Sequence, residues 1–419
     1  MKYTGFLCGA FSTRQSVVAD ADWRAVTMTE AERSKACNYY YPEFVEFSEG
    51  CSAHSMRRYE KRIDQRIPIS VGYAHTAREV EVNVAHITLY QAPYGMALFA
   101  IRIDMESEGN DITAVVSRLR SVDGLFQQNA AFASAVLDPL MAIYRRYAQR
   151  SGEVAGLPDS SEYYRLVEYG NKFKVFQIAI SEEDEWVAAS SDKLLFELGT
   201  LSPIGSYNPD DEYSSSDSYF NKIIGEGKVS VFNNWKALSL FDTFSILGHR
   251  ISATYVENWV ENYFGMLFVN ELFVKFYLFR LNNEFRNSQK GAEELLDQFN
   301  DFEYKCWFDN VSYNFLPRLI HRSMEQGLEV LSEKQRLYQM IERQKENRQK
   351  RNDQRMNNLL FYLTLLTTLS TIWDASSLCN EMYPYEHYVG SSIGGFRLVG
   401  YSMMLVVLLL VLTMRFRRK

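Results

Sequence analysis

Two long apolar runs near the end of the chain dominate its pattern of hydrophobic and polar positions. Residues 359–373 are fifteen positions without a charge, and residues 398–414 are seventeen more. With their apolar flanks, both approach the roughly 20 residues that a helix needs to cross a bilayer. The second run is too uniformly apolar for a helix with one solvated face. The pattern therefore predicts a transmembrane hairpin over 358–419, with spans at about 358–376 and 396–415. A buried core hairpin is the alternative.

Charged residues flank these runs asymmetrically. Residues 334–355 contain eight basic side chains against three acidic ones, and the chain ends Arg-Phe-Arg-Arg-Lys, whereas 374–396 contains no Lys or Arg. Because cytoplasmic loops carry the excess of Lys and Arg, we expect both termini in the cytoplasm and an inner (plasma) membrane location. The apolar stretch 5–11 is too short for the hydrophobic region of a signal peptide, so the first 350 or so residues are expected to stay cytoplasmic.

Residues 1–240 mix strand-like and helix-like patterns, which predicts an α/β or α+β cytoplasmic sensor domain. Aromatic and β-branched runs bounded by Gly, Asp or Ser indicate strands, and apolar residues at helical spacing indicate helices. The strands are predicted at Met96–Ile103, Tyr163–Tyr169, Phe173–Ile180 and Trp186–Ser190, and the helices at Ile112–Leu119 and Ala130–Arg150.

Residues 241–357 have a largely helical pattern and are assigned to a helical stalk. The aromatic run 252–284 is interrupted by Glu257, Glu261, Glu271, Lys275 and Arg280, each costing about 2.5–3.5 kcal/mol near a bilayer centre, so a packing helix is favoured over a span. A second run continues from Leu316 to Trp373 with Gly327 as its interruption. As one helix, these 58 residues would extend roughly 87 Å. Residues 342–355 are polar on every side, which suits either a water-filled funnel or a solvated juxtamembrane helix.

Composition and charge narrow the function. The 419 residues are 47% hydrophobic and 23% charged with a net charge of -7, which excludes wholesale disorder and argues against a direct nucleic-acid binder. Five widely spaced cysteines indicate neither a disulfide framework nor a zinc site. The six histidines are scattered without ligand spacing and are predicted to be structural; the metal ligands are left unknown. Because no catalytic motif occurs and the segment 225–228 lacks the upstream glycine of a phosphate loop, we expect neither an enzyme nor a covalent cofactor.

One face of the first predicted span is polar. Its members recur at alternating spacings of three and four residues: Asn357, Leu360, Thr364, Thr367, Thr371 and Asp374. Threonines in a membrane helix can bond to their own carbonyls or mediate packing, and they can also line water. The polar residues at the two ends favour the pore, because polar groups within membranes usually face water or protein. Since a two-helix hairpin cannot enclose a path alone, this reading requires a homo-oligomer.

At the far end of that span the sequence is acidic. Asn380, Glu381 and Glu386 would lie at the outer mouth, where rings of carboxylates raise the local cation concentration. The basic cytoplasmic flank has the opposite effect, so the sign of the conducted ion stays open.

The junction around Asn357 resembles that of the CorA-like magnesium transporter superfamily. The segment Gln-Arg-Met-Asn-Asn at 354–358 is similar to the family's stalk-to-membrane junction, and the long preceding helix, the short acidic loop and the basic C-terminus fit the same plan. The resemblance covers about 250–419. It implies a pentamer, a pore lined by the first span, and Mg²⁺ as a possible ion. Where the family has Gly-Met-Asn, this chain has Leu378-Cys379-Asn380 and keeps only the asparagine.

Such a divergent chain also resembles the CorA-like effectors encoded beside type III CRISPR systems, which implies gating by a nucleotide second messenger in antiviral defence. A patch that combines guanidinium groups with aromatic rings is the candidate nucleotide-type ligand site; a solvated helix face is its alternative. The patch comprises Tyr144, Arg145, Arg146, Tyr147 and Arg150, with Arg102 as a weaker candidate.

Three functions therefore compete. The first is a ligand-gated CorA-like ion channel, the second a constitutive divalent-cation (magnesium) transporter, and the third a membrane-anchored binding scaffold without a pore.

Overall fold

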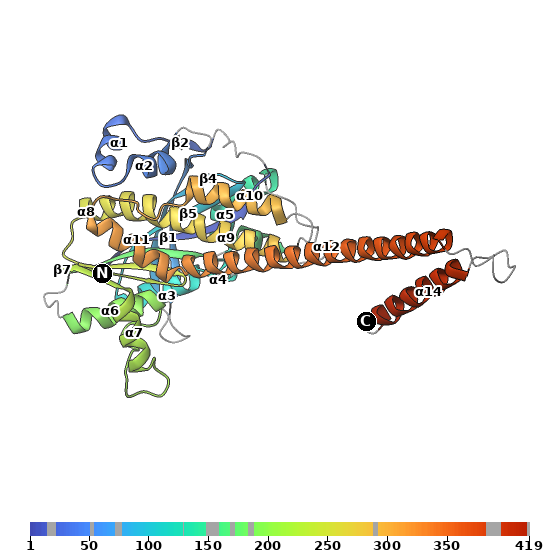
Figure 1. Cartoon of the computed structure of the whole chain (residues 1–419). Helices are drawn as coiled ribbons and strands as arrows, with labels where there is room; N and C mark the ends of the chain where they lie inside the picture. Colours follow the sequence, from blue (N-terminus) through green and yellow to red (C-terminus); the bar gives the residue numbers. More distant parts are fainter. Residues whose placement is uncertain are drawn as a thin grey trace. The chain divides into compact units, whose positions relative to one another are not determined.

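The computed structural model describes residues 1–14, 22–50, 54–71, 78–128, 130–147, 159–167, 172–182, 188–287, 292–382 and 395–416. The chain divides into two compact units, Met1–Gln339 and Met340–Lys419. The first is a mixed α/β domain built on one sheet, and the second contains most of a long helix and the C-terminal helix (Figure 1).

The sheet of the first unit has nine strands in the order β2-β3-β4-β5-β1-β6-β9-β8-β7. Neighbouring strands are antiparallel except for β6 and β9, which are parallel. The strands are β1 (Lys2–Ser12), β2 (Arg24–Val26), β3 (Arg57–Val71), β4 (Arg78–Ala92), β5 (Met96–Glu106), β6 (Lys174–Ser181), β7 (Lys228–Phe232), β8 (Trp235–Leu240) and β9 (Thr243–His249).

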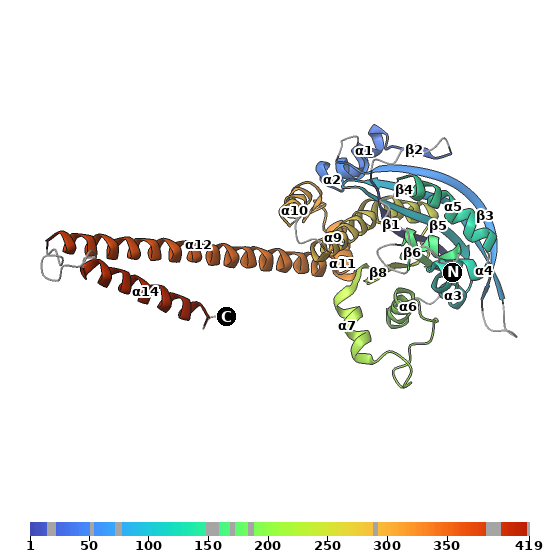
Figure 2. The same ribbon diagram turned by 90° about the vertical axis from the view of Figure 1, so that its right-hand side faces the viewer.

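The long strands β3 and β4 curve strongly (Figure 2). Their register shifts between Arg62 and Gln65, and the register of β4 against β5 shifts between Val84 and Ile87. Asp64, inside the first irregularity, has a φ of 46°. Extra residues of this kind bend a strand and increase its twist, so the two adjacent bulges account for the curvature.

Helices cover both faces of the sheet, because successive residues of a strand point to opposite sides. On β1, Tyr3, Leu7 and Phe11 belong to the core of the first face, whereas Phe6 points to the second. Figure 1 shows α6 and α7 on one side and α8 and α9 on the other. The helices of the first face are α3 (Gly109–Leu119), α4 (Val122–Gln128), α5 (Ala130–Tyr147), the 3-10 helix η1 (Asp159–Leu166), α6 (Ala188–Thr200) and α7 (Asp217–Gly227).

The second face is covered by a layer of aromatic side chains. Phe264 stacks on Phe6 with ring centroids 3.7 Å apart and lies 5.3 Å from Phe176, and Phe268 lies 5.4 Å from Phe176. The helices here are α8 (Ala253–Trp259), the π-helix η2 (Val260–Phe268), α9 (Val269–Asn287) and α11 (Phe315–Gly327). The remaining helices are α1 (Glu30–Cys37), α2 (Pro42–Glu49), α10 (Ala292–Cys306), α12 (Val330–Met382) and α14 (Gly395–Phe416).

The predicted mixture of strands and helices is confirmed. Met96–Ile103 and Phe173–Ile180 overlap β5 and β6, Ile112–Leu119 lies in α3, and the described part of Ala130–Arg150 is α5. Two strand predictions differ from the structure. Tyr163–Leu166 belongs to η1, with a single bridge from Val167 to Ala10, and residues 188–190 open α6. Aromatic and β-branched residues are enriched on half-buried surfaces of any backbone conformation, so their presence alone did not establish a strand.

The predicted boundary at residue 240 also differs. Strand β9 completes the sheet beyond it, and the aromatic run 252–284 supplies the helices of the second face, so residues 241–339 belong to the sheet unit rather than to a separate stalk.

The predicted helical run from Leu316 breaks between Gly327 and Val330. Glu329 has a φ of 56°, which ends α11 and starts α12 in a new direction. A Cβ on Gly327 would lie 2.2 Å from the Ser239 hydroxyl, so the close approach of α11 to β8 requires glycine there. The helix that continues, α12, spans 53 residues.

Replacing Phe264 with alanine should destabilise the sheet unit by about 3–5 kcal/mol, because a buried aromatic side chain is lost and a cavity is left. The change is measured by denaturant titration of the purified full-length protein. Tyr255→Ala is the control, since Tyr255 is 65% exposed. Equal stability of the two variants would contradict the assigned role of the stack.

Candidate functional site

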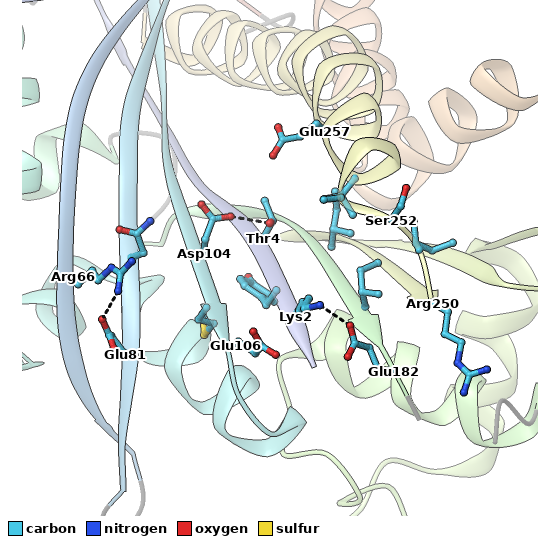
Figure 3. A pocket seen from close by; sticks show the side chains of 18 residues that line it. Lys2, Thr4, Arg66, Glu81, Asp104, Glu106, Glu182, Arg250, Ser252 and Glu257 are labelled. Carbon is cyan, nitrogen blue, oxygen red and sulfur yellow. Dashed lines mark hydrogen bonds and ion pairs between the residues drawn. The ribbon is translucent and has the colours of Figure 1, made fainter. Parts of the chain in front are cut away.

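A cavity of about 1040 Å³ opens on the second face of the sheet (Figure 3). Its floor consists of alternate residues of β3, β4, β5, β1 and β6, and its wall is formed by α8 and the residues that precede it. Further along the same face, the alternating positions are aromatic and covered by η2; at the cavity they are polar on β3, β4, β5 and β1 and are isoleucines on β6. Its principal lining residues are Lys2, Thr4, Arg66, Glu81, Asn83, Asp104, Glu106, Ile178, Ile180, Glu182, Arg250 and Glu257.

Charged side chains of both signs line the cavity. Lys2 Nζ lies 2.6 Å from a carboxylate oxygen of Glu182, and Arg66 lies 3.4 Å from Glu81. Arg250 follows β9 with a φ of 52°, a backbone conformation that tends to occur at functional sites in non-glycine residues. The volume lies at the upper end of small-molecule sites. Carboxylates can accept from hydroxyl and amino groups of a ligand, and guanidinium groups can pair with phosphate.

Arg102 fixes α8 to the sheet beside this cavity. Its guanidinium donates to Asp104 at 3.1 Å and to Glu257 at 2.5 and 3.0 Å. It lies 6.0 Å from the centre of the Phe6 ring. The hydrogen bond from Arg102 lowers the pKa of Glu257, although partial burial acts in the opposite direction. Because two carboxylates occupy this guanidinium, the structure does not leave Arg102 free for a phosphate.

The predicted ligand patch on α5 is divided between the core and the surface. Tyr144 and Tyr147 are buried, with Tyr144 packed edge-on at 5.4 Å from Phe11. Arg145 is exposed and donates to both carboxylate oxygens of Glu162 at 3.0 and 2.7 Å. Arg146 lies 5.3 Å from the Tyr147 ring, and Arg150 lies outside the described residues. The two tyrosine rings are therefore not exposed for stacking on the base of a ligand, because they are buried in the core of the first face.

The long helix α12 is the one described helix that is long and apolar enough to cross a membrane, and α14 contains a shorter apolar stretch, Leu398–Leu409. No residue of the apolar window in α12 is buried, unlike the core helix of a soluble domain. All six predicted pore residues are exposed along one face of α12. Glu381 is exposed near the helix end, Asn380 lies in its last turn, and Glu386 lies outside the described residues.

The threonine hydroxyls of this face donate to the helix itself. Thr364 donates to the carbonyl of Leu360 at 2.8 Å, Thr367 to that of Thr364 at 2.9 Å, and Thr371 to that of Thr367 at 2.8 Å. Each hydroxyl oxygen can still accept a hydrogen bond. The face is thus compatible with lipid and with water.

The helix α14 contacts the opposite side of α12. Trp373 and Tyr401 pack with ring centroids 5.5 Å apart, and a Cβ on Gly400 would lie 2.6 Å from the Ser376 hydroxyl. At 3.6 residues per turn, Trp373 and Ser376 lie about half a turn away from the threonine face. The half-buried stripe of α12 agrees with this geometry: Leu365, Leu369, Ile372 and Ser376. Among the described residues, α14 therefore leaves the polar face uncovered.

Comparison with known proteins finds no matching family model, curated protein or solved structure.

The cavity could not be located from the sequence. Its lining comes from five strands and one helix that are far apart in the chain, and only Arg102, next to it, stood among the candidate residues. The alternation of polar residues on β3 to β5 was the available signal, but its meaning depends on which strands are neighbours.

Replacing Glu257 with glutamine should lower the midpoint of thermal unfolding at pH 7. The free energy of unfolding should fall by only on the order of 1 kcal/mol, because the Glu257 side chain is 52% exposed and solvent weakens the ion pair. The bridge contributes above the ordinary pKa of 4.5 and is lost as the pH falls through the lowered pKa of Glu257. The difference from the parent should therefore vanish in acid. Glu261→Gln, on an exposed position of η2, is the control, and a difference that persists in acid would contradict this ion pair.

Proposed function

We propose that this protein is a homo-oligomeric ion channel of the CorA-like type, in which several copies of α12 surround a pore. The observation that carries the proposal is that α14 packs against one side of α12 and that, among the described residues, the face of Asn357, Thr364, Thr367 and Thr371 stays uncovered. In the proposed assembly α12 and α14 form a transmembrane hairpin with both termini cytoplasmic. The resemblance supports a pentamer.

The start of α12 supports control of the pore by the sheet unit. Val330 and Leu337 are fully buried in that unit. Asn282 of α9 donates to the Glu333 carboxylate at 2.8 Å, and Lys275 donates to the carbonyl of Leu328 at 2.6 Å. Because the same helix continues to Met382, a shift of α9 would be passed to the segment that carries the polar face.

We infer that a nucleotide-derived second messenger, bound in the cavity, gates this channel in an antiviral response of the CRISPR-associated type. The cavity has the size for such a ligand, and it combines guanidinium groups with acceptors for ribose and base donors. The helix α8, which forms the wall, continues directly into η2 and α9. The hydrogen bonds from α9 hold the start of α12. A ligand opens the pore only if it binds the open state more tightly than the closed one.

A scaffold without a pore is the second candidate, because the threonine hydroxyls already donate to helix carbonyls, as they do in lipid-facing helices. A constitutive transporter of divalent cations such as Mg²⁺ would use the same polar face, with Asp374 and Glu381 attracting cations. Flux without ligand would identify the transporter, and no flux under any condition would identify the scaffold.

Replacing Asn357 with tryptophan should reduce ion flux through liposomes containing the purified protein at least about tenfold, which corresponds to about 1.4 kcal/mol on the barrier. The bulky ring would narrow the path at the cytoplasmic end of the polar face. Leu366→Trp is the matched control, because Leu366 is 67% exposed and points away from the polar face. Unchanged flux in Asn357→Trp would remove this face from the pore.

Two ligand locations can be separated by calorimetry with adenine nucleotides as probes. Asn83→Trp fills the cavity and should abolish binding, whereas Arg145→Ala combined with Arg146→Ala should leave it unchanged. The reverse result would assign the ligand to α5 instead of the cavity. An absence of binding to the parent would count against a nucleotide as the gating ligand.

A further inference from the structure

Two carboxylates and one histidine form a buried cluster between α9 and α11. Glu271 comes from α9, and His321 and Glu325 come from α11 four residues apart. One ligand atom from each residue lies within 4.8 Å of the other two. Glu271 and His321 are each 2% exposed, and the side chain of Glu325 is 13% exposed. The cluster is therefore closed except at Glu325.

Several polar atoms in and beside this cluster lack a hydrogen-bond partner. His321 Nε2 lies 2.9 Å from Glu271 Oε1, but Nδ1 lies 3.8 Å from Glu325 Oε2, which is beyond a hydrogen bond. Among the described residues, no hydrogen bond reaches the carboxylate of Glu325. Asn270 donates to Glu271 Oε1 at 3.2 Å, while the oxygen of the same buried amide has no partner in the described structure. Acceptor atoms outnumber donors.

The electrostatic surroundings of the cluster are acidic. Two carboxylates face one imidazole, and Asp309 adds further negative potential, while Lys334 opposes it. Buried carboxylates without full pairing are costly. A divalent cation would neutralise both carboxylates and leave the imidazole neutral.

We propose that Glu271, His321 and Glu325 bind a divalent first-row transition-metal ion such as Zn²⁺. The ligand atoms of Glu271 and His321 lie 2.9 Å apart, so they need to separate by only about 0.5 Å to become two tetrahedral ligands at about 2.0–2.2 Å from one ion. Imidazole with carboxylates favours Zn²⁺ and its neighbours in the series, whereas Mg²⁺ prefers oxygen ligands and water. Three protein ligands leave a position for water, and the amide oxygen of Asn270 is available as its acceptor.

This site is separate from the proposed pore and the ligand cavity. It joins α9 to α11 beside the break that leads into α12. Bound metal would stabilise the contact between these helices, because binding to the folded state alone shifts the folding equilibrium.

The test uses tag-free full-length protein in detergent, dialysed against a chelator and then titrated with Zn²⁺ or Co²⁺. We expect one ion per chain, a visible Co²⁺ absorption spectrum, and a higher midpoint of thermal unfolding with Zn²⁺. Glu325→Gln should weaken binding at least about tenfold and abolish the thermal shift. Glu325 is chosen because it is partly exposed and its amide keeps the shape of the acid, so the variant should fold. Glu294→Gln, at an exposed position of α10, is the matched control.

Three results would overturn the proposal. They are no stoichiometric binding by the parent, equal affinity and an unchanged Co²⁺ spectrum in Glu325→Gln, or displacement of Zn²⁺ by an equal concentration of Mg²⁺. The first two would leave a hydrogen-bonded ionic cluster, and the third would exclude an imidazole ligand.

Discussion

The stack of Phe264 on Phe6 joins two parts of the chain that are more than 250 residues apart, and the rest of the structure depends on it. Phe6 lies on the central strand β1, and Phe264 lies in the helical segment that precedes α9 and α12. Burial of these rings holds η2 on the sheet. The contact thereby helps to position the wall of the cavity and, through α9, the start of α12. Because side chains alternate along β1, Tyr3, Leu7 and Phe11 pack into the core of the first face, and Phe6 packs against η2 on the second face.

The second face changes character along its length. Where Phe6, Phe176 and Phe244 project from the second face, the helices pack directly on the sheet. Where Thr4 and Asp104 take the alternate positions, the strands stay uncovered and the bulged, curved β3 and β4 enclose a cavity. Arg102 stands at the border, with its guanidinium bound to carboxylates of both the sheet and α8. Helix packing and the cavity therefore occupy adjacent parts of a single sheet face.

Sequence patterns identified local elements better than the relations between them. Periodicity located α3, α5, β5 and β6, because their signals lie within one segment. It misassigned residues 163–166, whose aromatic composition resembles a strand while the backbone forms a 3-10 helix. The sequence marked Gly327 as the interruption of the helical run but did not predict the break at Glu329, and the approach of Gly327 to Ser239 is a contact between distant segments. The cavity and the Glu271 cluster are likewise formed by long-range contacts, although the four-residue spacing of His321 and Glu325 was a local hint.

The self-bonded threonines of α12 have a consequence for how the proposed channel would close. Removing water from a polar pore is usually unfavourable, because hydrogen-bond donors that line the pore lose their partners. Here each hydroxyl of Thr364, Thr367 and Thr371 already donates within its own helix. Along the stretch lined by these threonines, expelling the water would cost little, so a slight constriction there could produce a dry, non-conducting state by dewetting. No side chain would have to plug the path.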